Sequence, residues 1–370
     1  MNAMLLEDCC EILDNLRVPI TASERKSGPY PYYGANGIQD YVDEYIFDDE
    51  LVLLAEDGGN FGSKTRPIAY RVSGKCWVNN HAHVLKPKPG LDVDFLCYSL
   101  MFYKTDGLVN GATRQKLTQA TMRKMLIPNM TLENQRIVVD KLNRVLSIKS
   151  EREKQLVKLD ELIKARFVEM FGNPITNEKG WNVEELDSVC DAIGDGLHGT
   201  PEYDEDGKYP FINGNNLMNG VIEVTPSTKK VSEKTYKKYY IELTDNAILL
   251  SINGTLGKLA FYNGEEVMLG KSACYCNLKQ KINREFVYGV MKTEAFTRFL
   301  ERNATASTIK NVGLRAIRGF KLILPPEELQ IKFVNFSRQI DKSKVVVPSK
   351  IKNAIFAIML SVSFGQITSI

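Results

Sequence analysis

The sequence predicts an α+β protein built from two similar domains and two long helices. Short apolar runs bounded by Gly, Asn and Asp occur in two regions of the 370-residue chain, as in strands. Parts of the first region return about 195 residues later, which is too far for a solenoid repeat. Each region is followed by a stretch with heptad spacing. The expected boundaries are 1–130 and 173–326 for the domains, and 131–172 and 327–370 for the helices.

The first domain is expected to combine strands with one helix. Apolar runs at 51–55, 69–72 and 82–85 are typical of strands because they are short and bounded by turn residues. Residues 93–104 carry Phe, Leu, Tyr and Met at helical spacing and predict a helix. Strand runs that cluster before a helix favour an α+β arrangement.

The first long helix is predicted between Thr131 and Phe171. Thr131 is a suitable N-cap, no Gly or Pro interrupts the segment, and Gly172 and Pro174 follow in the order that ends a helix. About forty residues make a rod of about 60 Å, and its single apolar seam requires a partner helix. The seam consists of Val138, Leu142, Val145, Leu156, Leu159, Ile163 and Met170, with Lys149, Arg152 and Arg166 as polar exceptions.

The C-terminal stretch is the expected partner of this helix. Pro348 interrupts its heptad and removes a backbone hydrogen bond, so the second rod is expected to be short, kinked or completed by a partner chain. The uncharged stretch 354–364 is too short to span a bilayer and is expected to be a packed helix. The apolar residues at equivalent heptad positions are Phe333, Ile340, Val347, Ile351, Ala354 and Ile358.

The second domain resembles the first in style and in two motifs. Residues 207–217 and 247–256 are strand-and-turn sequence, and 285–302 predicts a helix. Two similar domains suit the recognition of a target with two parts. Gly111-Ala-Thr-Arg-Gln-Lys-Leu117 matches Asn303-Ala-Thr-Ala-Ser-Thr-Ile309, and Tyr30-Pro-Tyr-Tyr-Gly-Ala-Asn-Gly-Ile38 matches Tyr209-Pro-Phe-Ile-Asn-Gly-Asn-Asn-Leu217.

Composition limits the compartment and the partners. A net charge of +3 permits nucleic-acid binding through local positive potential without requiring it. Seven cysteines without a C-x-x-C pair, and no secretory segment, predict reduced thiols in a cytoplasm. No segment is apolar over a membrane-spanning length, so a membrane is not an expected partner. Structural zinc is not expected, because Cys274-x-Cys276 has the wrong spacing.

Two segments resemble enzyme motifs but lack a residue or a spacing that the motif requires. Gly270-Lys-Ser272 resembles the end of a phosphate-binding loop, but Gly264 lies one residue too far upstream for the required spacing. Asn173-Pro-Ile-Thr176 lacks the second proline and the aromatic residue that would stack on a flipped base. Without a Gly-rich cofactor turn, Asn173-Pro174 is interpreted as a helix stop.

Two further groups of polar residues have structural interpretations beside functional ones. His81 and His83 lie on one face of a predicted strand, which allows a two-histidine metal site, but no third ligand is indicated. The glycine-rich stretch 56–62 allows a phosphate cradle, but Glu56 and Asp57 argue against a bare anion site. Strand packing and a tight turn that admits a large polar partner are the favoured interpretations.

The polar loops at the repeated motif are the principal candidates for DNA contact. Thr113-Arg-Gln-Lys116 and Thr305-Ala-Ser-Thr-Ile-Lys310 each precede a short predicted helix, and their donors suit phosphates and base edges. A solvated capping loop is the alternative interpretation. The full candidate set is Asn36, Asn60, Arg66, Asn80, His81, Thr113, Arg114, Gln115, Lys116, His198, Thr200, Asn213, Asn215, Asn216, Asn253, Thr255, Lys258, Lys271, Thr305, Ser307, Thr308 and Lys310.

Five segments carry a resemblance to a known family. They are Leu6-Glu-Asp-Cys-Cys-Glu-Ile-Leu13, Leu186-Asp-Ser-Val-Cys-Asp-Ala-Ile193, Tyr209-Pro-Phe-Ile-Asn-Gly-Asn215, Ile248-Leu-Leu-Ser-Ile-Asn-Gly-Thr-Leu-Gly257 and Ile323-Leu-Pro-Pro-Glu-Glu-Leu-Gln330. In these segments the chain resembles the specificity subunit of type I restriction–modification systems. The likeness covers essentially the whole chain, as the order domain, helix, domain, helix.

This resemblance implies a non-catalytic subunit that recognises double-stranded DNA. Each target recognition domain would contact one half of an interrupted target, and two antiparallel coiled-coil helices, related by a pseudo-twofold, would fix the distance between the halves. Methyltransferase subunits, two in number, and restriction subunits would be the protein partners. No cofactor is expected on this chain, since S-adenosylmethionine, ATP and Mg²⁺ would belong to those partners.

Two hypotheses from other classes compete with this one. A stand-alone DNA methyltransferase would need the cofactor loop and the complete Asn-Pro-Pro-aromatic motif, which the sequence does not contain. A coiled-coil scaffold with two protein-binding domains would share the predicted architecture but would not retain DNA.

Overall fold

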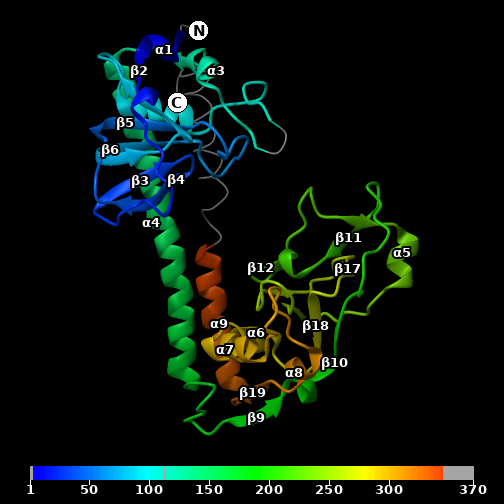
Figure 1. Ribbon diagram of the computed structural model, residues 1–370. Coiled ribbons are helices and arrows are strands. Elements are labelled where there is room, and N and C mark those ends of the chain that lie inside the picture. Colours follow the sequence, from blue (N-terminus) through cyan, green and yellow to red (C-terminus); the bar gives the residue numbers. More distant parts are fainter. Residues whose placement is uncertain (1–2, 112–113, 345–370) are drawn as a thin grey trace. The chain divides into compact units, whose positions relative to one another are not determined.

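A computed structural model describes residues 3–111 and 114–344 (Figure 1). Internal contacts divide the chain into two compact units, with the division between Lys154 and Gln155. Unit 1 is the part that precedes this division, and unit 2 is the part from Gln155 to Lys344. The domain boundaries expected from the sequence stay predictions, because the division falls inside a helix.

Unit 1 is built on a six-stranded sheet with the order β2-β7-β5-β6-β3-β4. Its neighbouring strands are antiparallel, except that β3 runs parallel to β6. A separate antiparallel pair joins β1 to β8. The strands are β1 (Ala3–Leu5), β2 (Cys10–Ile12), β3 (Tyr30–Gly34), β4 (Gly37–Val42), β5 (Phe47–Ala55), β6 (Ala69–Val78), β7 (Ala82–Pro87) and β8 (Leu126–Pro128).

The helix α2 (Val93–Met101) packs against this sheet, where it buries Phe95 and Leu96 with Leu54 and Leu85. Its N-cap is Asp92, whose carboxylate accepts the first free backbone N–H groups. The predicted strands at 51–55, 69–72 and 82–85 lie within β5, β6 and β7. The Leu-Glu-Asp segment that follows β1 forms a single helical turn, α1 (Leu6–Cys9).

Unit 2 repeats this topology. A four-stranded antiparallel sheet has the order β10-β18-β15-β16, and β11 pairs in parallel with β17, as β3 does with β6 in unit 1. The pair β9 and β19 corresponds to β1 and β8. The strands are β9 (Asn182–Glu185), β10 (Cys190–Asp195), β11 (Tyr209–Ile212), β12 (Leu217–Met218), β13 (Val221–Ile222), β14 (Lys230–Val231), β15 (Ala247–Ser251), β16 (Leu259–Phe261), β17 (Met268–Leu269), β18 (Ala273–Leu278) and β19 (Lys321–Leu324).

The sequence predicted a single helix at 285–302, and this prediction is wrong because the structure has two helices there. They are α6 (Arg284–Met291) and α7 (Glu294–Asn303). The backbone turns at Thr293, which adopts the extended conformation of an N-cap before α7. The short helices and 3₁₀ turns are α3 (Gln119–Arg123), α5 (Glu233–Lys238), α8 (Leu314–Arg318), η1 (Asp14–Leu16), η2 (Leu186–Val189) and η3 (Gly214–Asn216).

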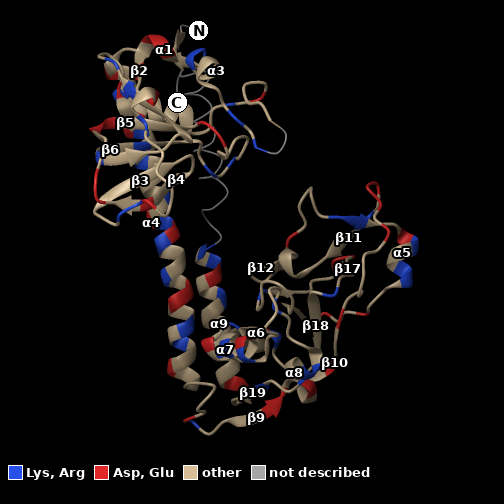
Figure 2. Cartoon of the chain, viewed as in Figure 1, with Lys and Arg blue, Asp and Glu red and all other residues tan. Residues whose placement is uncertain are grey.

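The predicted long helix is α4 (Leu132–Phe171), and its N-cap and C-terminal glycine are as expected. Thr131 Oγ1 accepts from the backbone N–H of Asn134, and Gly172 has the left-handed φ of 76° that ends helices. Val138 and Leu142 are buried in the core of unit 1. Lys and Arg alternate with Asp and Glu along the rest of the helix (Figure 2). These charged side chains allow the helix surface to be exposed to solvent.

Within unit 2, α4 packs antiparallel to α9 (Glu327–Lys344). Asp160 Oδ1 lies 2.7 Å from Lys344 Nζ, and the ring centroid of Phe167 lies 5.3 Å from that of Phe333. The two helices therefore run in opposite directions. Phe171 completes an aromatic cluster with Phe333 and with Phe286 of α6. The expected pairing of the two helices is therefore present as far as Lys344. The expectations for Pro348 and for 354–364 lie outside the described residues.

None of the helices in the described ranges is both long and apolar enough to cross a bilayer. The seven cysteines are free thiols, and all are buried.

Candidate nucleic-acid interface

The candidate loop of unit 1 is fastened to the end of β5 by backbone hydrogen bonds. The N–H of Gly58 donates to the carbonyl of Gln115 at 3.1 Å, and the N–H of Leu117 donates to the carbonyl of Glu56 at 2.7 Å. Leu117 is fully buried and α3 begins two residues later. The side chains that precede Leu117 are therefore held at a fixed edge of the sheet.

The candidate loop of unit 2 is fastened in the same way to the end of β15. The N–H of Gly254 donates to the carbonyl of Lys310 at 2.9 Å, and the N–H of Val312 donates to the carbonyl of Ile252 at 2.9 Å. Val312 is fully buried and precedes α8. Both loops introduce a short helix, as the sequence predicted.

These bonds correct the alignment of the repeat. They equate Gln115 with Lys310, a separation of 195 positions (310 minus 115). Matching residue types instead equates Gly111 with Asn303, a separation of 192 positions (303 minus 111). The sequence match followed threonine and alanine identities, whereas the register is set by backbone groups, which every residue type except proline supplies in full.

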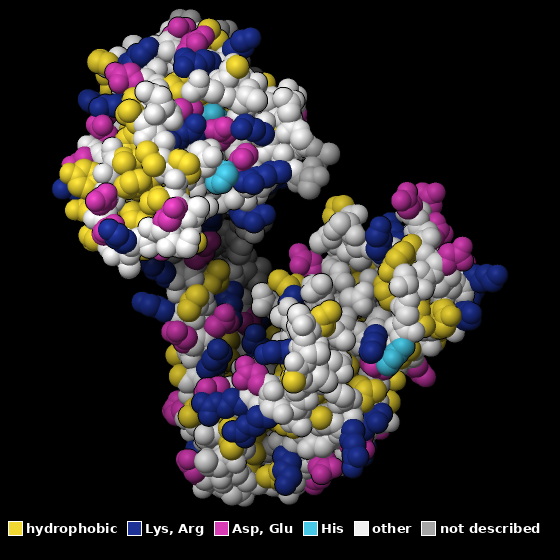
Figure 3. Space-filling view, viewed as in Figure 1, with side chains coloured by type: hydrophobic (Ala, Val, Ile, Leu, Met, Phe, Trp, Pro, Cys, Tyr) yellow, Lys and Arg dark blue, Asp and Glu magenta, His cyan; other side chains and the backbone are white. Residues whose placement is uncertain are grey.

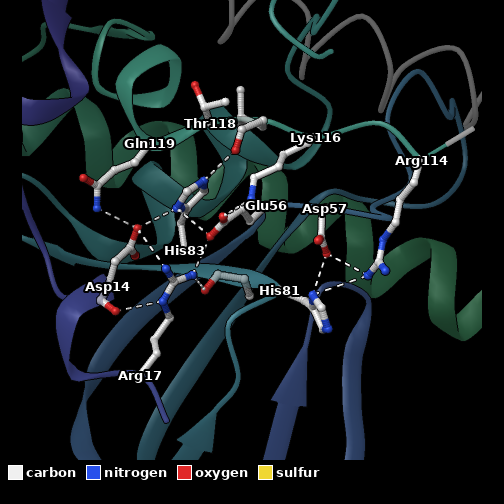
Figure 4. Close-up of polar contacts among 12 residues, drawn as sticks. Asp14, Arg17, Glu56, Asp57, His81, His83, Arg114, Lys116, Thr118 and Gln119 are labelled. Carbon is white, nitrogen blue, oxygen red and sulfur yellow. Dashed lines mark hydrogen bonds and ion pairs between the residues drawn. The ribbon is translucent and has the colours of Figure 1, made fainter. Parts of the chain in front are cut away.

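A buried ionic network lies beneath the loop of unit 1 (Figure 4). His83 is fully buried: its Nδ1 lies 2.7 Å from Asp14 Oδ2, and its Nε2 lies 2.9 Å from the carbonyl oxygen of Leu117. Asp14 also accepts from the N–H of Val84 and from the amide of Gln119, each at 2.9 Å. Because both ring nitrogens face acceptor oxygens, the doubly protonated imidazolium satisfies the site.

Glu56 joins this buried pair to the surface. Its carboxylate accepts from Arg17 at 2.7 Å and lies 3.0 Å from Lys116 Nζ. Arg17 lies 3.6 Å from Asp14, and His83 lies 3.7 Å from Glu56. Two carboxylates and three cationic groups thus alternate from the interior to the loop, which balances the charges that burial would otherwise penalise.

A second, more exposed group surrounds Asp57. Its Oδ1 lies 2.6 Å from Nδ1 of His81 and 2.9 Å from Nη2 of Arg114. The side chains of Arg114 and Lys116 are 58% and 50% exposed, whereas that of Asp57 is 19% exposed. The cations therefore lie outermost, where acceptor atoms of a binding partner can reach them. Charged side chains gather around the histidines on this face of unit 1 (Figure 3).

The network changes the ionisation of its two inner carboxyls. Burial disfavours the charged form of Asp14, but hydrogen bonds from His83, Val84 and Gln119 and the charge of His83 lower its pKa below the ordinary value. Burial acts in the same way on Glu56, and hydrogen bonds from Arg17 and Lys116 lower its pKa. Both groups are therefore ionised at neutral pH.

The sequence allowed, but did not favour, a two-histidine metal site on His81 and His83. The two histidines contact different carboxylates, Asp57 and Asp14, because His81 precedes β7 and only His83 lies within it. The structure instead places ligand atoms of Asp14, Glu56 and His83 within 4.8 Å of one another. That grouping is a different set of three residues, which shares only His83 with the pair that the sequence allowed.

The chemistry of this grouping fits an ionic network better than a metal. Arg17 and Lys116 already neutralise the carboxylates, and a divalent cation would be repelled by both. Nε2 of His83 donates to Leu117, so only its Nδ1, engaged by Asp14, remains as a possible ligand atom.

Unit 2 carries a simpler version of the site. Leu54 pairs with His83 in unit 1, and the corresponding Leu250 pairs with Cys274 in unit 2. The position of Glu56 is taken by Ile252, since both carbonyls accept from the residue that closes the loop. The described residues of unit 2 therefore include no counterpart of the His83–Glu56 pair.

Uncharged groups dominate the loop of unit 2. Thr305 and Ser307 share a hydrogen bond of 2.8 Å, and Asn253 donates to Asn311 at 3.4 Å. His198 lies 2.8 Å from Asp195 and its side chain is 60% exposed. The other predicted residues here that are exposed to solvent are Thr200, Asn215, Thr255, Lys271, Thr308 and Lys310, and Lys258 is half-buried.

Several predicted asparagines are engaged within the protein. Asn213 and Asn216 form a reciprocal capping box around η3. Asn36 donates to the carbonyl of Gly58 at 3.0 Å, and Asn60 donates to that of Pro67 at 3.4 Å. These residues shape turns beside the loops, so the structure gives them a bracing role.

The remaining predicted residues of unit 1 are Arg66, Asn80 and Gln115, which are exposed, and Thr113, which lies outside the described residues. Sequence reasoning did not propose Asp14, Arg17 or Gln119. The spacing of Asp14 and Arg17 offered a signal, since an aspartate three residues before a basic residue type recurs as Asp195 and His198.

Comparison with known proteins agrees with this architecture. The family model described as "Type I restriction modification DNA specificity domain" matches residues 1–159 and 178–356. A Haemophilus influenzae protein named "Putative type I restriction enzyme specificity subunit S.HindORF215P" is 28% identical over 343 residues, which cover 89% of this chain and 85% of that protein.

Two solved structures share the fold. The type I restriction–modification S subunit from M. genitalium has a TM-score of 0.51 at 15% identity, covering 98% of this chain and 94% of its own. A chain from a study of assembly and conformational transition of the type I R-M system has a TM-score of 0.54 at 17% identity, covering 98% and 97%. The family resemblance noted in the sequence is thereby confirmed. This chain belongs to the type I restriction–modification DNA specificity family, and its function is DNA target recognition.

Proposed function

We propose that each unit of the chain recognises one half of an interrupted, asymmetric duplex target, and that the chain itself catalyses no reaction. The observation that supports this is one loop, held by the same backbone bonds at the same strand end, occurring once in each unit. The loops differ in chemistry, since one carries Arg114 and Lys116 and the other carries Thr305 and Ser307. Different side chains on one scaffold suit two different base sequences.

The loop of unit 1 carries donor groups that can bind hydrogen-bond acceptors of DNA. Arg114 has a planar guanidinium group that can make a bidentate contact with O6 and N7 of guanine. Lys116 supplies a single positive charge for phosphates or base edges. Gln115, between them, is exposed and has both donor and acceptor atoms. In unit 2, the hydroxyl groups of Thr305 and Ser307 and the ammonium group of Lys310 can make contacts that carry fewer charges.

The proposal extends to partners and to location. Methyltransferase subunits, two per chain, dock on the helices and recognition units, and restriction subunits join that assembly. S-adenosylmethionine, ATP and Mg²⁺ bind to those subunits, so this chain directs methylation and restriction to its target in the cytoplasm. Helices α4 and α9 set the spacing of the half-sites, because a stiff connector fixes their separation and limits the ordering entropy of binding the second half.

A selection experiment tests this proposal. The full chain, purified with its methyltransferase subunit, is mixed with duplexes that contain a randomised segment, and the retained DNA is sequenced. We expect two short preferred sequences at one fixed spacing, with affinity that falls steeply as salt rises. Retention without sequence preference would overturn the proposal. Methylome sequencing of the host with and without the gene provides an independent measurement of the same target.

A further inference from the structure

We propose that His83 is a positioning residue that determines the base preference of unit 1, by holding the loop that carries Arg114 and Lys116. This inference rests on the proposed function, because it concerns how one half-site is recognised. His83 itself touches no DNA, since its side chain is fully buried. It acts through the loop above it.

The direct contact is between the imidazole and the loop backbone. Nε2 of His83 donates to the carbonyl oxygen of Leu117 at 2.9 Å, immediately after Lys116. The ring is itself oriented by Asp14, which accepts from Nδ1 at 2.7 Å and is braced by Gln119 of α3. The end of the loop is thus held from the sheet on one side and from the following helix on the other.

The side chains of the loop are also held from below. Glu56 lies 3.0 Å from the ammonium of Lys116, and Asp57 lies 2.9 Å from the guanidinium of Arg114. These carboxylates lie beside the backbone bonds that fasten the loop to β5. A displacement of Leu117 would therefore move both cations relative to the positions at which they meet an acceptor.

Burying these charges is not required for the loop to fold. Unit 2 forms the same loop, with the same backbone bonds, above Cys274 and Ile252 instead of His83 and Glu56. Buried ion pairs stabilise a fold little compared with apolar residues of similar size, and a role in conformational specificity is the alternative. The ionic network is therefore best explained by what distinguishes the loop of unit 1, namely its two exposed cations.

The test uses the full chain in complex with its methyltransferase subunit and a library of duplexes with a randomised segment. His83→Ala removes the contact to Leu117. His83→Gln retains an amide donor for that carbonyl. Cys274→Ala is the matched control, because this buried residue occupies the equivalent strand position of unit 2 and its thiol donates to the carbonyl of Tyr275, outside the loop. Gln115→Ala and Lys310→Ala identify which half-site belongs to which unit.

We expect His83→Ala to reduce discrimination between bases about tenfold at the half-site of unit 1 and to leave the other half-site unchanged, since one well-placed contact contributes about that much. His83→Gln should recover most of the preference, and Cys274→Ala should change neither half-site. If His83→Ala does not fold, Asp14→Asn provides the same test, because it removes the charge that orients the ring while retaining the shape.

Two results would overturn the inference. One is unchanged base preference in His83→Ala or Asp14→Asn. The other is an equal loss at both half-sites, which would indicate a general effect on folding. Failure of the unaltered complex to prefer any sequence is a different outcome, since it would reject the proposed function itself.

Discussion

Replacement of Phe333 by alanine tests the pairing of α4 with α9 in unit 2. Phe333 is 1% exposed, and its ring lies 5.3 Å from Phe167 and 5.6 Å from Phe171. Truncating a buried Phe costs about 3–5 kcal/mol through lost burial and the cavity that remains. For a unit of this size we expect the midpoint of thermal unfolding to fall by roughly 10 °C.

Tryptophan fluorescence can assign this loss to one unit. The chain has two tryptophans, Trp77 in unit 1 and Trp181 in unit 2. The indole of Trp181 donates to the carbonyl of Phe171 at 2.8 Å, so it reports directly on the end of α4. In a Trp77→Phe background, urea unfolding followed by fluorescence measures unit 2 alone.

The control is Ile331→Ala on the same helix. Ile331 is 43% exposed, and its truncation is expected to change the free energy of unfolding by less than about 0.5 kcal/mol. A loss below about 1 kcal/mol for Phe333→Ala would refute the reasoning, because it would mean that the aromatic cluster does not hold the helices together.

Three further predictions concern function and pH. Arg114→Ala or Lys116→Ala should weaken DNA binding, and loss of one phosphate contact should reduce the slope of log affinity against log salt by about 1, measured by titration at several salt concentrations. The lowered pKa values of Asp14 and Glu56 mean that the unfolded chain takes up protons first as pH falls. Unit 1 should therefore lose stability from about pH 5 downward, and Asp14→Asn should flatten that slope in acid-dependent urea unfolding. Insertion of one heptad near Lys149 should change the preferred half-site spacing in duplex selection, and an unchanged spacing would contradict the role of α4 as a spacer.

Local signals account for the parts of the fold that the sequence predicts well. Thr131, the heptad and Gly172 together define α4 to within a residue, because capping and periodicity are properties of neighbouring residues. The strands of unit 1 follow from short apolar runs. The segment 285–302 was predicted as one helix because apolar residues recur along all of it, and the local N-cap signal of Thr293, between α6 and α7, was missed.

The candidate site is less accessible to sequence reasoning. The loops were located correctly, but their register is set by backbone bonds that carry no residue signature. The ionic network joins Asp14 to His83, which are 69 positions apart, and to Glu56. Acidic residues beside a glycine-rich turn argued against an anion site when taken alone. The cationic partners of Glu56, which are Arg17 and Lys116, come from distant segments, and the sequence did not indicate that they pair with it.

The most direct test compares two substitutions at equivalent positions, Gln115→Ala in unit 1 and Lys310→Ala in unit 2. Each variant, in complex with its methyltransferase subunit, selects duplexes from the randomised library, and the retained sequences are compared with those of the unaltered complex. We predict that each substitution alters base preference in a different half-site and leaves the spacing unchanged. Changes confined to the same half-site, or no change with either variant, would contradict the assignment of one half-site to each unit.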